Sequence, residues 1–148
     1  MKGEEFSSIC IDKGIGVLRS LTRSRLFMRV HAATFEESLK KLYIYMENPS
    51  QISFEDEILM IIRSFIVRTQ SITPVMWELF TKFPAILEKN KHQFKELFDT
   101  INMYLITGRE GFIQNQDMLK VVVQMAATAL QTTNPTQSVN NSEGAILL

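Results

Sequence analysis

The sequence predicts an all-α protein, and three observations support this fold class. The 148 residues include only six glycines and four prolines, which are few for the turns of a β-rich protein. Apolar residues recur three and four positions apart along most of the chain, the spacing of one helix face. The expected starts of the third and fifth helices, Ser53 and Asn90, lie about 37 residues apart, near the roughly 40–47-residue period of HEAT and armadillo repeats. We therefore expect an α-solenoid of antiparallel helix pairs, about three pairs plus the start of another, although a compact helical bundle would give a similar pattern.

Residues 1–50 are expected to form the first helix pair. An apolar stripe predicts a helix over about 4–21. The second helix is expected over about 34–47, because Thr34 and Glu37 have the spacing of a capping box. In that motif each side chain accepts a hydrogen bond from the other residue's backbone N–H, which fixes the helix start.

Residues 51–131 are expected to form two HEAT-like helix hairpins, over about 53–89 and 90–131. Ser53 is a suitable N-cap for the first of these helices. Three acidic residues in the following turn complement the positive end of the helix dipole, namely Glu55, Asp56 and Glu57. A binding site for a basic partner is the alternative interpretation of these acids.

Prolines predict where the first of these hairpins is divided. Thr73-Pro74 is typical of a helix start, with an N-cap followed by proline at the first helical position, where its missing N–H costs nothing. Pro84 lies inside the apolar pattern that follows. Because proline lacks the N–H needed inside a helix, we expect Pro84 to kink or divide the helix near Phe83.

The second hairpin has its own boundary signals. Asn90 and Gln93 have the spacing of another capping box, which would open the fifth helix. Gly108 and Gly111 indicate a loop after that helix. Asn115 is then expected to cap a sixth helix, whose apolar stripe ends near residue 131.

The composition changes after residue 131. Residues 132–141 are polar and typical of a linker. Residues 142–148 have the pattern of the start of a truncated helix, opening at Ser142-Glu143. A helix that stops within about two turns has nothing to satisfy its last backbone groups. We therefore expect the chain to be an internal or C-terminal-half piece of a longer helical array.

Charge and cysteine content narrow the class of function. Sixteen basic and sixteen acidic residues give a formal net charge of zero, which argues against a strongly basic nucleic-acid coat, and we expect no direct binding to nucleic acid. The single cysteine, Cys10, has no internal disulfide partner, which favours a cytosolic or nuclear setting. Arg63 and Arg68 interrupt the longest apolar stretch, so we expect no membrane insertion.

No catalytic, cofactor-binding or metal-binding residue is predicted, and we do not expect an enzyme. His31 and His92 lie far apart and lack carboxylates or cysteines at ligand spacing, whereas a zinc site needs about four ligands. Cys10 is expected to pack as a small hydrophobe on an apolar helix face. Gly14-Ile15-Gly16 lacks the third glycine and the preceding strand of a dinucleotide-binding loop.

One basic stretch is the charge feature that could carry function. No acidic residue lies between Lys13 and Glu36. The basic stretch itself consists of Lys13, Arg19, Arg23, Arg25 and Arg29. We interpret the stretch as a solvated helix end and a connecting loop. The alternative is a binding patch for an acidic partner or for RNA.

Three stretches after residue 51 share their order and spacing with a family of long helical-repeat proteins. The first runs from Phe54-Glu55-Asp56-Glu57-Ile58 to Ser64-Phe65. The second, the most specific, is Ile72-Thr73-Pro74-Val75-Met76-Trp77-Glu78-Leu79-Phe80. The third runs from Leu97 to Leu105, through the loop at Gly108, and from Asp117-Met118-Leu119-Lys120 to Leu130. Ser142-Glu143-Gly144-Ala145 falls where another repeat helix would begin. Together they resemble the importin-β (karyopherin-β) superfamily of nuclear transport receptors, in particular the branch of importins seven and eight.

The resemblance implies a function in nucleocytoplasmic transport, by binding and not by catalysis, in the cytoplasm, the nucleus and the nuclear envelope. Such receptors carry basic cargo such as ribosomal proteins or histones, contact phenylalanine-glycine nucleoporins, and release cargo on binding Ran-GTP. The family's Ran-contacting repeats lie toward its N-terminus and are not among these residues, so no partner-binding residue is assigned. Trp77 is expected to be a core anchor between repeats. The alternative is an unrelated α-helical scaffold or adaptor, with the basic stretch as its partner site.

Overall fold

The structure is a computed structural model that describes residues 2–47, 55–89 and 94–131. These residues form eight α-helices and no strand, so the prediction of an all-α protein is confirmed. The helices are α1 (Lys2–Arg23), α2 (Arg25–Glu47), α3 (Glu55–Thr69), α4 (Pro74–Phe80), α5 (Phe83–Lys89), α6 (Phe94–Thr107), α7 (Arg109–Gln114) and α8 (Gln116–Gln131). Several expectations lie outside the described residues: the cap at Ser53, the capping box of Asn90 and Gln93, the linker 132–141 and the helix start at 142–148.

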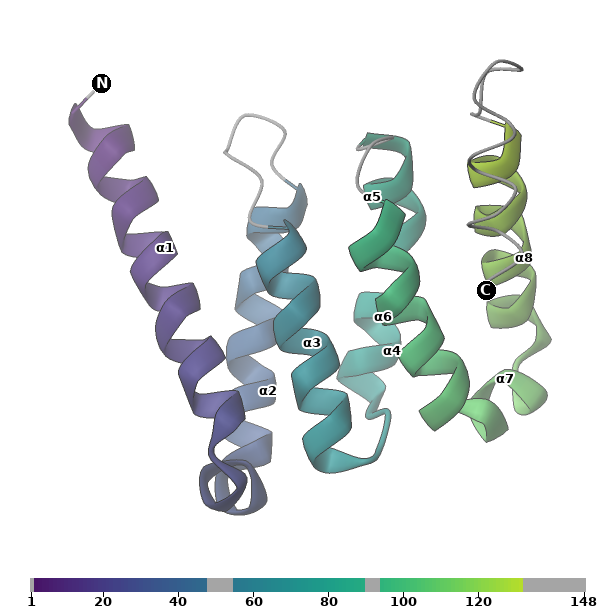
Figure 1. The fold of residues 1–148 in the computed structure, drawn as a ribbon, viewed down its shortest axis with the longest axis horizontal. Helices are drawn as coiled ribbons and strands as arrows, with labels where there is room; N and C mark the ends of the chain where they lie inside the picture. The colour runs from purple at the N-terminus through teal and green to yellow at the C-terminus, as the bar shows by residue number, and fades with distance from the viewer. Residues whose placement is uncertain (1, 48–54, 90–93, 132–148) are drawn as a thin grey trace.

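The helices lie side by side in two rows (Figure 1). In one row α3 contacts both α1 and α6. In the other row α2 contacts α4, and α5 contacts α8. The chain passes between the rows as it proceeds, so that α1 packs against α2, α2 against α3, and α5 against α6. Several helices that follow one another in the sequence are therefore also neighbours in space.

The helix α3 forms the centre of the core. Apolar side chains on three of its sides are at most 1% exposed: Ile58, Leu59, Ile61, Ile62, Phe65 and Ile66. The ring of Phe65 stacks on that of Phe35 in α2, with the ring centroids 5.6 Å apart. Burying each such side chain contributes about 1.5–3 kcal/mol. The packing of α1, α2 and α6 around α3 is therefore driven by these residues.

A cluster of aromatic rings joins α4 to α6 and α7. The ring of Trp77 lies edge-on to Tyr104 and to Phe112, with centroid distances of 5.8 and 5.0 Å. The Tyr104 hydroxyl donates a hydrogen bond of 2.7 Å to the backbone carbonyl of Met76, and burial raises the pKa of Tyr104. Because the phenol stays protonated, it remains a donor. Trp77 is thus half-buried and packs against the core.

One proline marks the start of α4, and another marks its boundary with α5. Thr73 caps α4, since its side chain accepts a hydrogen bond from the Met76 N–H at 3.3 Å, and Pro74 occupies the first helical position. The predicted division at Pro84 is also confirmed: α4 ends at Phe80, and α5 begins one residue before the proline. In this first turn the missing N–H of proline removes no helical hydrogen bond.

The expected start of the second helix at Thr34 is only partly found. The helical segment already begins at Arg25, and Thr34 lies three residues after the kink at which two helices join within α2. Ser24 provides the start instead, since its hydroxyl oxygen accepts a hydrogen bond from the Phe27 N–H at 3.2 Å. The helical path is interrupted at His31, which has φ −119° and ψ 22°. The basic stretch, which was interpreted as a helix end and a connecting loop, therefore lies in α1 up to Arg23 and in α2 from Arg25, with only Ser24 between the two helices.

The expected loop at Gly108 and Gly111 is only partly found, because Gly108 separates α6 from α7 whereas Gly111 lies inside α7. A short helix, α7, occupies this region, and Asn115 directly precedes α8, where a cap was expected. Both glycines also serve close packing. A Cβ on Gly108 would lie 2.8 Å from the Tyr104 carbonyl oxygen, and one on Gly111 would lie 2.5 Å from the ring of Trp77. Both positions need the absence of a side chain.

Glycine substitutions provide a test of this packing. Gly14→Ala and Gly16→Ala in α1 should each stabilise the protein by up to about 1 kcal/mol, because alanine favours the helix and the added Cβ meets no atom within 4 Å. Gly111→Ala should cost about 1–3 kcal/mol, because the Trp77 ring must shift. Urea unfolding followed by circular dichroism measures both changes. If Gly111→Ala gained as much stability as Gly14→Ala, the close approach of Trp77 to α7 would be refuted.

Candidate functional site

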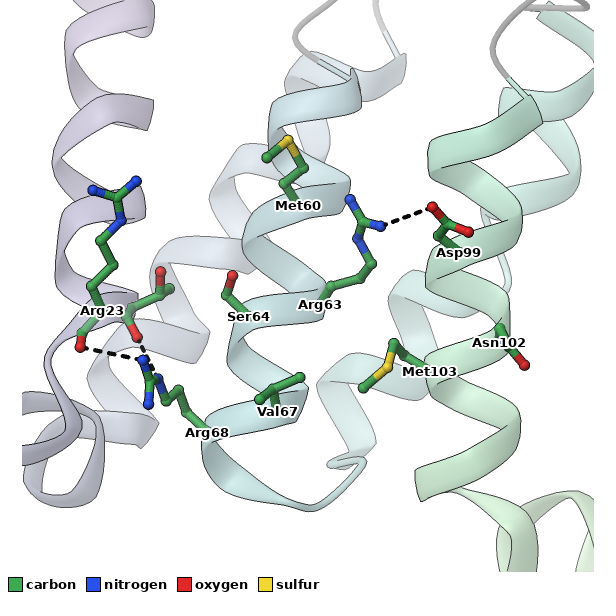
Figure 2. Close-up of a pocket in the computed structure, with 10 residues that line it drawn as sticks. Arg23, Met60, Arg63, Ser64, Val67, Arg68, Asp99, Asn102 and Met103 are labelled. Carbon is green, nitrogen blue, oxygen red and sulfur yellow. Dashed lines mark hydrogen bonds and ion pairs between the residues drawn. The ribbon is translucent and has the colours of Figure 1, made fainter.

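A groove crosses the exposed face of α3, between the end of α1 and the middle of α6 (Figure 2). The groove has a volume of about 580 Å³. The residues of α3 that line it are three and four positions apart, so they share the side of the helix that the buried residues leave free. The lining residues are Thr22, Arg23, Met60, Arg63, Ser64, Val67, Arg68, Asp99, Asn102 and Met103. We call this surface the α3 groove.

The charge of Arg63 in the α3 groove is neutralised by α6. Its guanidinium forms an ion pair with Glu96 and a second with Asp99, at 3.3 Å from Nη1 to Oδ2. Lys95 also lies 3.3 Å from Asp99. These opposite charges hold α3 against α6 across the groove (Figure 2). They leave this wall with little net charge for a ligand.

Arg68 binds backbone instead of carboxylates. Its Nε donates a hydrogen bond to the carbonyl oxygen of Thr22 at 3.2 Å, and its Nη2 donates to that of Arg23 at 3.5 Å (Figure 2). These carbonyls belong to the last turn of α1, where a helix has no internal donors for them and where its dipole is negative. Arg68 therefore joins the ends of α1 and α3 while it keeps its positive charge.

A second cavity lies beside the first, between the start of α2 and the end of α3. It has a volume of about 800 Å³ and shares Val67 and Arg68 with the α3 groove. Its lining contains three arginines and no acidic residue: Arg25, Met28, Arg29, Ala32, Val67, Arg68, Thr69 and Gln70. We call this cavity the arginine pocket.

The structure brings together part of the basic stretch that the sequence singled out. Arg25 and Arg29 line the arginine pocket, and Arg23 lines the adjoining α3 groove. Lys13 and Arg19 do not join them. These two line a different cavity on α1, together with acidic residues from α1 and α3, Asp12 and Glu57.

Arg68 is the pocket residue that sequence reasoning missed. In the sequence it served to interrupt an apolar stretch, about 40 residues away from the basic stretch. A basic residue in the last turn of a helix commonly interacts with unpaired backbone carbonyls at a helix end, and the sequence does show this local pattern. The carbonyls that Arg68 contacts belong to another helix, α1, so they could be identified only from the packing of α1 against α3.

The remaining candidate residues do not form a site with one another. Cys10 is exposed, so the expectation that it would pack in an apolar surface was wrong; the buried face of α1 follows Ile15 and Leu18 instead. His31 is exposed, and its ring lies 5.2 Å from that of Phe27. His92 lies outside the described residues. Within the described part of the chain, no three potential metal-binding side chains converge.

Two acidic residues in the first turn of α3, Glu55 and Asp56, are directed toward the protein itself. Glu55 is 2% exposed and lies 3.3 Å from the ammonium group of Lys89 in α5. Oδ1 of Asp56 is buried and has no hydrogen-bond partner among the described residues. Burial is the main cause that raises the pKa of Asp56; repulsion from Glu96 and Glu55 adds to it, and Arg63 opposes it. Ionised Asp56 is therefore unfavourable in the folded protein.

Comparison of the chain with known proteins identified no relative. No model of a protein family, no curated protein and no solved structure matches it. Among the described helices, none combines the length and the apolar character that a membrane span requires.

Asp56→Asn provides a pH-dependent test of the α3 start. The folded pKa of Asp56 lies above its ordinary value of 3.8, so the folded protein holds the proton more tightly and loses stability as the pH rises through that folded pKa. Asp56→Asn should therefore raise the melting temperature at neutral pH. Its advantage should shrink as the pH falls through the folded pKa of Asp56 toward the ordinary value of 3.8, and should be gone below 3.8.

Asp117→Asn is the matched control for this substitution. Asp117 lies in the first turn of α8 with an 87% exposed side chain and an ion pair to Lys120. The same chemical change there should give no gain at neutral pH. Equal effects of the two substitutions on the melting temperature at all pH values would contradict the burial of Asp56.

Proposed function

We propose that the chain is a helical-repeat segment of a nuclear transport receptor of the importin-β type, which acts by binding proteins and not by catalysis. In this proposal the two rows of helices are a short α-solenoid of HEAT-like pairs. The observation that carries it is the order of neighbours: α1, α3 and α6 follow one another in one row, while α2, α4 with α5, and α8 form the other. A solenoid has this order because each pair packs on the preceding pair.

The segment 72–80, which carries the most specific resemblance to the family, lies where stacked helix pairs would contact one another. Thr73 opens α4 and its hydroxyl also donates a hydrogen bond to the carboxylate of Glu36 in α2. Trp77, one turn later, packs against Tyr104 in α6 and Phe112 in α7. The motif therefore connects the preceding and the following helices, which supports a repeat segment.

The proposed partners are those of the family, phenylalanine-glycine nucleoporins and basic protein cargo, with Ran-GTP bound by repeats that this chain does not contain. The chain would act in the cytoplasm, the nucleus and the nuclear pore. Several apolar side chains on α6, α7 and α8 are exposed to solvent and would offer contact to a phenylalanine ring: Ile106, Ile113, Leu119 and Val123. Such contacts are individually weak, as transient passage through a pore requires.

A second candidate function is that of an α-helical adaptor outside nuclear transport. The arginine pocket favours it, because the family's cargo is basic and a pocket with three arginines would repel basic cargo. The two functions differ in what the chain should bind: phenylalanine-glycine repeats in one, and an acidic partner without such repeats in the other.

Binding to phenylalanine-glycine repeats tests the transport proposal. We expect the chain to bind a nucleoporin repeat peptide, and to lose this binding when the phenylalanines are replaced by serine. Fused to an inert protein too large to diffuse through the pore, the chain should accumulate at the nuclear envelope of permeabilised cells. Absence of both repeat binding and envelope accumulation would refute the proposal.

A pair of substitutions makes this test specific to the proposed surface. Ile113→Ser on α7 should weaken repeat binding severalfold, whereas Leu26→Ser on α2 should leave it unchanged, although both side chains are strongly exposed, at 68% and 74%. Because neither residue belongs to the core, both variants should melt like the unmodified chain. Equal effects on repeat binding would refute the assignment of that surface.

A further inference from the structure

The arginine pocket concentrates positive charge from two helices in one concave surface. Arg25 and Arg29 come from the first turns of α2, and Arg68 comes from the last turn of α3. No acidic residue lines the cavity of about 800 Å³. The pocket is therefore formed by segments that are distant in the sequence, and its sign is uniformly positive.

The charges of the pocket are not compensated by the protein around it. Arg25 and Arg29 are exposed, and neither has an ion pair with a carboxylate among the described residues. They are four positions apart on one helix, where like charges repel. Arg63, only five residues before Arg68, shows the contrast, because Glu96 and Asp99 neutralise it. An anion in the pocket would relieve the repulsion that the chain leaves in place.

Arg68 is fixed before any ligand arrives. Its hydrogen bonds to the Thr22 and Arg23 carbonyls use Nε and Nη2, and Nη1 has no partner among the described residues. A guanidinium that is already held in place loses little conformational freedom on binding, so less of the binding energy is spent on ordering it. Arg25 and Arg29 are free to adapt to a ligand of variable shape.

The non-charged lining indicates which class of anion fits. Met28, Ala32 and Val67 form the apolar part of the cavity, and its lining contains no aromatic ring. Nucleic-acid bases would find no stacking partner there. A flat lipid bilayer cannot enter a concave surface, whereas an extended peptide can place carboxylates on the arginines and an apolar side chain on Val67, which is 47% exposed.

We propose that the arginine pocket binds an acidic segment of a partner protein, in which carboxylates alternate with apolar side chains. Guanidinium groups pair with carboxylates through charge-assisted hydrogen bonds, which gives such a segment a defined position. This inference rests on the pocket alone. It specifies the partner of the second candidate function, that of an adaptor, and its test uses a ligand distinct from the phenylalanine-glycine repeats that test the transport proposal.

The proposal is tested by binding of a labelled peptide in which glutamate alternates with leucine, measured by fluorescence anisotropy with the full chain. We expect binding that weakens as sodium chloride is added, and no binding of the same peptide with glutamine in place of glutamate. Equal affinity for the two peptides would overturn the proposal. Tighter binding of single-stranded RNA, or of vesicles that contain phosphatidylserine, would also overturn it in favour of those partners.

Charge-matched substitutions locate the binding site. Arg29→Gln should weaken peptide binding by about 3- to 10-fold, whereas Arg19→Gln removes the same charge outside the pocket and should have little effect. Arg25→Gln serves as a second pocket variant. Both pocket residues are exposed, so circular dichroism should show unchanged helix content. Equal losses in the Arg19 and Arg29 variants would mean that binding follows net charge and would overturn the pocket.

Discussion

The structure depends on the burial of one helix, α3. Its apolar residues face α1, α2 and α6 at once, and Ile61, Ile62 and Ile66 have no measurable exposure. A helix that is covered on three sides leaves one narrow strip, from Met60 to Val67, for solvent. The α3 groove occupies this strip. The surface that a partner could use thus follows from how the core is filled, because Arg63, Ser64 and Arg68 lie on the side of α3 that the buried residues leave free.

Close aromatic packing holds α4, α6 and α7 together. The ring of Trp77 approaches the backbone of α7 so closely that Gly108 and Gly111 admit no side chain. The Tyr104 hydroxyl is buried and bonded to a backbone carbonyl of α4. Aromatic rings at such distances fix the relative positions of α4, α6 and α7. By contrast, the two glycines within α1, Gly14 and Gly16, lie in open surroundings, so only the glycines near Trp77 are required by packing.

Local signals in the sequence were sufficient for the helical class and for some boundaries. Thr73-Pro74 and Pro84 act on their own turns, and both were placed correctly. The start of α2 was missed because Ser24 lies within a basic stretch that resembles a loop. Gly111 was misread as part of a loop because it is required by the close approach of Trp77. Of the arginine pocket, the sequence indicated Arg25 and Arg29 as candidates. It could not supply Arg68, since that residue joins them only through the packing of α3.

Arg68 both stabilises the fold and lines the two cavities, which has a consequence for natural sequence variation at this position. Its guanidinium satisfies the last carbonyls of α1 and also lines both cavities. A missense mutation at this codon would therefore change two traits together: the amount of folded protein in the cell, through lost helix-end contacts, and whatever recognition depends on the cavities. Mutations at Arg25 or Arg29 would separate the two traits. Natural variation at these three codons should accordingly be constrained to different degrees, with Arg68 the least tolerant.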